Sequence, residues 1–241
     1  MKVLAVDTSS AVAAVAVMDE EKGLLGEYLQ NNGRTHSQRL MLMVDTLLKG
    51  LEIKLEDIDA FAASIGPGSF TGLRIGITSI KAMAYPHNKP VVSIPTLDAL
   101  AYNMLCFKGL VCPMMDARNR QVYTAVYENT SHGQIKITDY CGIRIEELVQ
   151  IIKEKATPAV FLGDAVDLYR EYLKEELVGN CFFAPASQML QRASSVAGLA
   201  LEKALKGQTE SSFDMVPFYL RKSQAEQIYE KRVRSEQNDK S

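Results

Sequence analysis

Apolar residues in the first part of the chain occur either in short runs or at a spacing of three to four positions. Short apolar runs bounded by turn residues are typical of buried strands, and the wider spacing is typical of helices. The runs predict strands at residues 2–6, 11–18, 24–29, 60–65 and 91–94. The helical spacing predicts helices at residues 37–51, 71–85 and 97–106, and Pro86 ends the second of them.

The rest of the chain repeats this order of elements. Strands are predicted at residues 110–115, 122–127, 135–143 and 159–162, and helices at 145–155, 166–177 and 191–206. Three strands, a helix, a strand and a helix therefore occur twice, without a repeat in the sequence itself. This pattern predicts an α/β fold of two lobes, each a mixed sheet flanked by helices, with the second lobe reduced. We expect lobes at residues 1–108 and 109–225 and a charged, mobile tail at 226–241.

Composition narrows the class of protein. A chain of 241 residues, of which 47% are apolar, can bury a core of its own. Its 27 basic and 29 acidic residues nearly balance, so no basic surplus indicates direct binding to nucleic acid. The four cysteines form no CxxC pair, which argues against a zinc site and fits reduced thiols in the cytoplasm. Because the sequence shows no leader-like segment and no apolar run of membrane-spanning length, we expect a cytoplasmic protein without a membrane anchor.

The most specific stretch of the sequence follows the predicted strand at 60–65 and reads GPGSFTGLRIG over residues 66–76. Proline fixes its own φ and glycine permits positive φ, so this segment predicts a sharp turn. Ser69 and Thr71 are both able to cap the helix that follows. Free amides at the start of a helix can bind an anion, but a tight turn without a ligand explains the same residues equally well.

Residues 66–76 resemble the GPGSFTGLRIG signature of the TsaB (YeaZ) family. Further segments resemble that family in the same order along the chain, at residues 4–9, 36–40, 115–118, 121–125 and 217–221. The resemblance implies an actin-like fold, related to Hsp70, sugar kinases and ribonuclease H. It also implies a non-catalytic role in the transfer of threonylcarbamoyl to N6 of the adenosine 3′ to the tRNA anticodon. In that role the chain would bind and stabilise the catalytic subunit TsaD and with it recruit the ATPase TsaE, while tRNA is contacted only through the complex.

The two long helices predicted in the first lobe carry apolar residues on more than one face. A helix that rests on a single sheet needs a narrower stripe, so a partner is expected to cover this surface, unless loops or the C-terminal segment of the chain do so. Methionine suits such a surface because it repacks easily. In the TsaB family these helices pair with TsaD or with a second TsaB copy, and we expect a homodimer when the chain is alone. The predicted interface residues are His36, Leu40, Met41, Met43, Val44, Leu47, Leu48, Leu73, Ile75, Ile77, Ile80 and Tyr85.

Asp7 ends the first predicted strand, where actin-like phosphotransferases place an acidic residue that serves the metal and the phosphate. A turn aspartate that caps the following backbone is an equal alternative. The turn after Asp7 reads Thr-Ser-Ser-Ala and lacks the glycines that let a phosphate approach. We expect no tightly bound cofactor, although ATP or ADP could occupy the junction with the partner. The candidate phosphate contacts are Asp7, Gly66, Gly68, Ser69, Thr71, Gly72, Arg74 and Arg118.

No metal site is predicted, because His36, His87 and His132 are far apart in the sequence. The competing hypothesis is a stand-alone nucleotide phosphohydrolase or kinase of the actin-like fold. Asp7 and Asp116 would then hold a metal ion, and the glycine-rich turn would contact phosphate. Glycine in the two phosphate turns would favour this enzyme, and nucleotide turnover by the isolated chain would demonstrate it.

Overall fold

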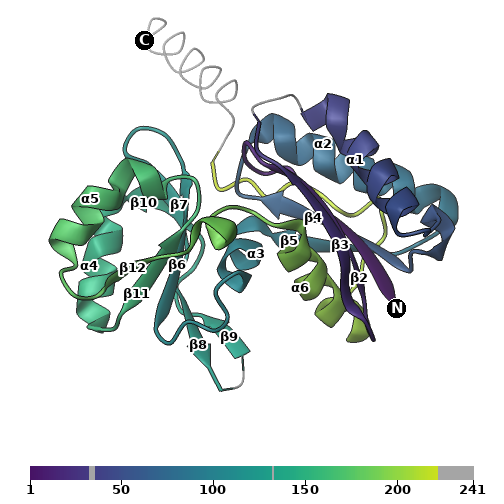
Figure 1. Ribbon diagram of the computed structural model, residues 1–241. Coiled ribbons are helices and arrows are strands. Elements are labelled where there is room, and N and C mark those ends of the chain that lie inside the picture. Colours follow the sequence, from purple (N-terminus) through teal and green to yellow (C-terminus); the bar gives the residue numbers. More distant parts are fainter. Residues whose placement is uncertain (33–35, 132, 222–241) are drawn as a thin grey trace, which may run out of the picture.

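The computed structural model of the protein describes residues 1–32, 36–131 and 133–221 and folds them into two α/β lobes that lie side by side (Figure 1). The predicted tail at 226–241 lies outside these residues. The first sheet has the strand order β3-β2-β1-β4-β5. Its strands are β1 (Lys2–Asp7), β2 (Ala13–Asp19), β3 (Gly23–Gln30), β4 (Ala60–Gly66) and β5 (Val91–Pro95). The first three strands pair antiparallel, whereas β1, β4 and β5 pair parallel, which confirms the predicted mixed sheet.

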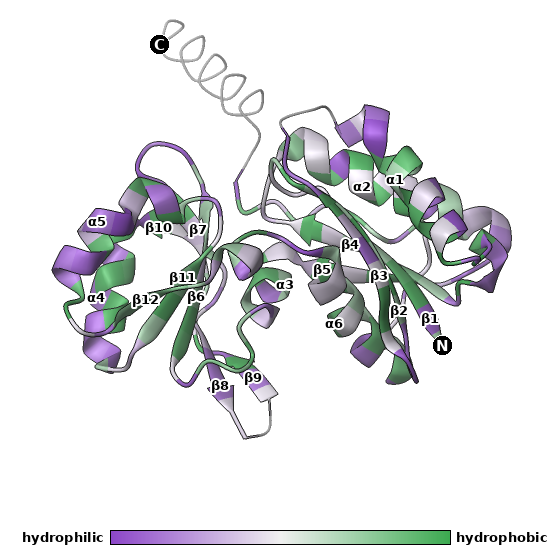
Figure 2. Ribbon diagram, viewed as in Figure 1, coloured by the Kyte–Doolittle hydropathy of each residue, from purple (hydrophilic) through white to green (hydrophobic). Residues whose placement is uncertain are grey.

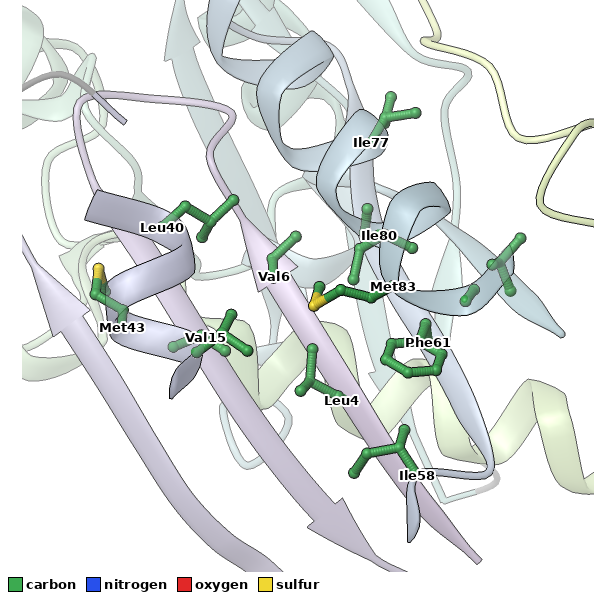
Figure 3. Packing of buried hydrophobic residues seen from close by; sticks show 14 of the residues in the cluster. Leu4, Val6, Val15, Leu40, Met43, Ile58, Phe61, Ile77, Ile80 and Met83 are labelled. Carbon is green, nitrogen blue, oxygen red and sulfur yellow. The ribbon is translucent and has the colours of Figure 1, made fainter. Parts of the chain in front are cut away.

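Helices cover both faces of the first sheet, which explains why β1 is apolar almost throughout. The helices of this lobe are α1 (His36–Gly50), α2 (Phe70–Ala84) and α6 (Ala193–Leu205). Successive side chains of a strand point to opposite faces, so Leu4 and Val6 pack against α1 and α2, while Val3 and Ala5 pack against α6. Figure 3 shows the first cluster, in which Leu4, Val6 and Phe61 of the sheet lie with side chains of the two helices.

The second lobe contains a sheet with the strand order β10-β7-β6-β11-β12, and β8 and β9 continue it from β6. Its strands are β6 (Leu110–Asp116), β7 (Gln121–Thr124), β8 (Tyr127–Thr130), β9 (Gly133–Lys136), β10 (Cys141–Arg144), β11 (Ala159–Leu162) and β12 (Cys181–Phe183). Its helices are α4 (Ile145–Lys155) and α5 (Val166–Glu176). In Figure 2, β6 and β11 are hydrophobic along most of their length, whereas α4 and α5 carry both kinds of residue and bury only their apolar sides.

Two predicted strands of the second lobe are each divided into two. The predicted strand at 122–127 becomes β7, which pairs with β6 and β10, and β8, which pairs with β6 and β9. The predicted strand at 135–143 becomes β9 and β10. The chain changes neighbours at these breaks, where Ile137 N donates to Val126 O at 2.8 Å and Val126 N donates to Thr138 Oγ1 at 2.9 Å. The short strand β12 was not predicted.

The helix α6 and the chain that follows it return to the first lobe. Val196 and Ala200 pack with Val3 on the second face of the first sheet, and Glu210 forms a β-bridge with Val91 at the edge of β5. The structure therefore differs from the predicted division, which placed all of residues 109–225 in the second lobe. The small apolar residues of α6 suit a close approach to either sheet, so their pattern did not indicate which sheet the helix covers.

The helix α3 (Thr96–Tyr102) lies between the two lobes. Leu97 and Leu100 of this helix pack against Val111 and Val160 of the second sheet, and α3 also contacts α6, β4 and β5 of the first lobe. None of the helices in the described part of the chain is long and apolar enough to cross a membrane.

Most of the predicted partner-interface residues on α1 and α2 lie inside the first lobe. The structure corrects this prediction at eight positions, which are at most 8% exposed: Leu40, Met43, Val44, Leu47, Leu48, Leu73, Ile77 and Ile80. The two helices carry apolar residues on more than one face because they pack on the sheet and also contact each other. Of the remaining residues on these helices, Met41 and the adjoining Tyr85 are exposed, and Ile75 is half-buried.

Replacing Leu40 by alanine is expected to lower the free energy of unfolding by about 2–5 kcal/mol, because a fully buried leucine leaves a cavity in the core. Met41 is its neighbour on α1 but is exposed, so Met41→Ala should change that free energy by less than about 0.5 kcal/mol. Urea unfolding of both variants beside the unaltered protein measures the two values. Equal, small effects would contradict the packing of α1 on the sheet.

Candidate functional site

Residues 66–76 dock α2 onto the turn that follows β1. Ser69 N donates a hydrogen bond to Ser9 O at 2.7 Å, and Thr8 Oγ1 donates to Gly72 O at 2.7 Å. Gly72 N donates to Ser69 Oγ at 3.2 Å, so Ser69 is the cap of the helix, as predicted. The amides of Ser69 and Gly72 are therefore already engaged by the protein itself.

Three glycines of this segment permit the close approach, because atoms of the turn occupy the place of their side chains. A β-carbon added to Gly68 would lie 2.3 Å from Ser9 O, and one added to Gly72 would lie 2.0 Å from Thr8 O. At Gly76 the nearest atom would be Thr8 Oγ1, at 2.4 Å. The chain itself thus fills the place of a side chain at Gly68 and Gly72, and the phosphate contacts predicted at these glycines stay a prediction.

The structure places the remaining candidate phosphate contacts on different surfaces. A β-carbon on Gly66 would meet a carbonyl oxygen of the C-terminal segment at 2.2 Å, so this glycine also serves a backbone contact. Thr71 and Arg74 lie on the exposed side of α2. Arg118 belongs to the second lobe, where its side chain is exposed and its Nε lies 3.7 Å from Asp116 Oδ2.

Asp7 is buried at the end of β1 and is held by hydroxyl and amide donors of its own lobe. Its Oδ1 accepts hydrogen bonds from Ser9 N at 2.9 Å and from Ser9 Oγ at 2.6 Å, and its Oδ2 accepts one from Ser64 Oγ. Burial raises the pKa of the Asp7 carboxyl, and these hydrogen bonds together with His36 offset only part of that effect. The arrangement matches the alternative in which Asp7 caps the turn.

The start of α1 and the chain before α6 close over the same turn. His36 Nε2 lies 2.8 Å from Ser10 O, and Ser10 Oγ donates to Gln191 Oε1 at 2.9 Å. The structure therefore corrects the prediction that His36 faces a partner, because its half-buried ring packs on the turn. The sequence did not predict Gln191 or Ser64 as site residues. The hydrogen bond between Gln191 and Ser10 joins residues 181 positions apart, so no local sequence pattern could indicate it.

The matching turn of the second lobe follows β6 and contains three consecutive residues of positive φ. These are Arg118, Asn119 and Arg120, with φ of 63°, 53° and 58°. Asp116 Oδ1 accepts a hydrogen bond from Arg118 N at 2.8 Å, and Asp164 Oδ1 accepts one from Asp116 N at 3.1 Å. Asp116 thus caps its turn much as Asp7 caps the turn of the first lobe.

Within residues 1–32, 36–131 and 133–221, no three His, Cys, Asp or Glu side chains are grouped closely enough to hold a metal ion.

Two lobes of this kind, each built on a mixed sheet with flanking helices, define an actin-like ATPase fold. The family described as TsaD: tRNA N6-adenosine threonylcarbamoyltransferase matches residues 23–229. Among curated relatives, the tRNA threonylcarbamoyladenosine biosynthesis protein TsaB of Bacillus subtilis is 32% identical over 226 residues, which cover 94% of this chain and 96% of that protein. The protein of the same name from Escherichia coli is 27% identical over 93% of this chain and 96% of its own length.

A solved structure extends the likeness to three dimensions. YeaZ from Pseudomonas aeruginosa superposes with a TM-score of 0.77 at 26% sequence identity, over 91% of this chain and 99% of that one. The chain belongs to the TsaB (YeaZ) family. The resemblance drawn from residues 66–76 and the other segments, and the actin-like fold that it implied, are both confirmed.

Replacing Gly72 by alanine is expected to lower the free energy of unfolding by about 3 kcal/mol or more, because its β-carbon would collide with the backbone of Thr8. Gly50 at the end of α1 has no atom within 4 Å of its β-carbon position. Gly50→Ala should therefore be neutral or should stabilise the protein by up to about 1 kcal/mol. Thermal unfolding of both variants tests the pair, and a harmless Gly72→Ala would refute the backbone contact.

Replacing Asp7 by asparagine is expected to leave the protein at least as stable at pH 7, because the amide keeps an acceptor for Ser9 N and carries no buried charge. A raised pKa means that the folded state binds the proton more tightly, so the contribution of Asp7 to stability falls as the pH rises above its ordinary value of 3.8. The advantage of the variant should therefore grow between pH 4 and pH 7 in unfolding experiments.

Asp45→Asn provides the control, because Asp45 is exposed on α1 and pairs with Lys49. This substitution should change the free energy of unfolding by less than about 1 kcal/mol across the same range. If Asp7→Asn instead lost stability relative to the unaltered protein as the pH rose, the folded state would lower the pKa of Asp7, and burial would not be the dominant effect.

Proposed function

We propose that the chain is a non-catalytic partner subunit in the biosynthesis of threonylcarbamoyladenosine in tRNA. It binds and stabilises TsaD, the subunit that carries out threonylcarbamoyl transfer, and the pair recruits TsaE. The observation that carries the proposal is the likeness to two curated TsaB proteins over more than nine-tenths of this chain and of each relative.

The surface of the first lobe supports a pairing role for α1 and α2, which lie next to each other on the outside of that lobe (Figure 1). Once the core residues are set aside, Met41 and Leu42 still point outward from α1, at 48% and 64% exposure. Tyr85 directly follows α2 and is 62% exposed. Single exposed apolar side chains are common, but large ones on α1 and directly after the adjacent α2 favour contact with a partner. We name Met41, Leu42, Ile75 and Tyr85 the outer helix surface.

Two further features belong to the same proposal. A nucleotide, ATP or ADP, occupies the junction with TsaD, and Thr71 and Arg74 are the predicted contacts that stay exposed beside the outer helix surface. When TsaD is absent, a second copy of the chain takes its place. Contact with tRNA is made by the assembled complex, since this chain has no surplus of basic residues.

The competing hypothesis assigns phosphohydrolase or kinase chemistry to Asp7 and Asp116. Each of these carboxyls caps the turn of its own lobe, and the glycines next to the first turn are used for backbone packing. Magnesium-dependent ATP turnover by the purified chain alone would favour the enzyme. Restoration of tRNA modification when the chain is added to TsaD and TsaE, without such turnover, would favour the partner subunit.

Leu42→Glu is expected to weaken binding to TsaD at least tenfold, about 1.4 kcal/mol, because a charge would be placed in an apolar contact. Leu168 on α5 provides a matched control, since it is also a helical leucine and is 63% exposed, against 64% for Leu42. Leu168→Glu should bind TsaD with unchanged affinity. Calorimetric titration with purified TsaD measures both variants, after light scattering has fixed the stoichiometry. Equal affinities for the two variants would remove α1 from the interface.

A further inference from the structure

The last described segment of the chain, residues 217–221, attaches firmly to the first lobe. Phe218 N donates a hydrogen bond to Ile65 O at 2.7 Å, next to the place where Gly66 leaves room for Phe218 O. The ring of Tyr219 stacks on that of Phe70 at the start of α2, with centroids 3.9 Å apart and planes 5° apart. Arg74 Nε donates to Tyr219 Oη at 3.2 Å. The segment is therefore fixed to both β4 and α2.

The same five residues also reach the second lobe. The Phe218 ring meets that of Tyr140 edge-on, with centroids 5.5 Å apart. Arg221 Nη1 donates to Ala117 O at 3.0 Å, and Arg221 Nη2 donates to Gln121 Oε1. Ala117 belongs to the turn after β6, and Gln121 is the first residue of β7. Both of these hydrogen bonds of the Arg221 side chain are with the second lobe, so this side chain links the segment to that lobe.

The place of this link matters because the lobes already meet elsewhere. The helix α3 packs on the second sheet and on the first lobe, and Asp98 of α3 accepts hydrogen bonds from Tyr127 Oη at 2.6 Å and from Tyr140 Oη at 2.8 Å. The chain also passes from β12 to α6 at this place, where Asn103 Nδ2 at the end of α3 donates to Gln188 O at 2.9 Å and to Leu190 O at 3.0 Å. Connections that lie close together and contain few residues permit rotation of one lobe relative to the other, as hinges do. Residues 217–221 join the lobes at a second place, between the carboxyl ends of β4 and β6.

We propose that residues 217–221 form a C-terminal clasp that holds the two lobes in one relative orientation. With the clasp in place, α3 and the clasp fix the lobes at two points and prevent hinge motion. Without the contacts of Arg221 and Phe218, the lobes rotate about α3. The clasp also lies at the strand ends where open α/β sheets bind ligands, so it keeps that edge of the molecule closed.

The clasp can be tested by measuring the distance between the lobes in the full chain. Spin labels at the exposed positions Thr46 on α1 and Glu175 on α5, attached through a genetically encoded ketone side chain, leave the four native cysteines unmodified. Arg221→Ala and Phe218→Ala should each broaden the distribution of distances between the labels and add longer distances. Circular dichroism establishes that each variant is folded.

Two control variants match the chemistry of these changes. Arg120→Ala removes an arginine too, but this arginine belongs to the turn after β6 itself and pairs with Glu146 within the second lobe, at 3.2 Å. Phe213→Ala also removes a phenylalanine from the C-terminal segment, but its ring contacts Tyr85 of the first lobe. Both controls should keep the distribution of the unaltered protein.

The result that would overturn the clasp is a folded Arg221→Ala variant with an unchanged distance distribution. Equal broadening in Arg221→Ala and in Arg120→Ala would overturn it as well, because the effect would then come from the turn and not from the link. If Phe218→Ala fails to fold, Arg221→Ala decides the question alone, since Arg221 lies at the end of the described chain and contributes no core side chain.

Discussion

The first lobe depends on one contact between two stretches of backbone, the turn after β1 and the start of α2. The carbonyl oxygens of Thr8 and Ser9 lie where side chains would stand at Gly72 and Gly68. This contact fixes α2 against the turn, and Asp7 fixes the turn from the other side through Ser9 and Ser64. The buried carboxyl and the glycine-rich segment are thus parts of one structural unit.

The second sheet and the far end of the chain are organised around the same region. The helix α6 brings the chain back to the first lobe, and the clasp then runs from β4 to the turn after β6. Elements that are distant in the sequence therefore converge on the strand ends of both lobes. Open α/β sheets commonly bind ligands at such strand ends, and the described chain crosses this region with residues 217–221.

The sequence predicted the order and kind of most elements, because buried strands and amphipathic helices leave short periodic patterns. It could not predict whether the apolar faces of a helix are covered by the lobe itself or by a partner. Leu40 and Ile80 were assigned to a partner, yet both lie in the core, since two helices that touch each other and a sheet need apolar residues on more than one face. The candidate site was predicted in part: Asp7 and Ser69 were found as turn and cap residues, while Gln191 depends on a contact from the other end of the chain.

The glycines of α2 also determine how far this helix stands from the sheet. A single methyl group at Gly72 would meet the backbone of Thr8 and would have to lift the helix away from the turn. The outward side of α2, and with it Arg74 and the adjoining Tyr85, would move by the same amount. The height of the outward side of α2 above the sheet is therefore set on the inside of the lobe, by the backbone atoms of Thr8.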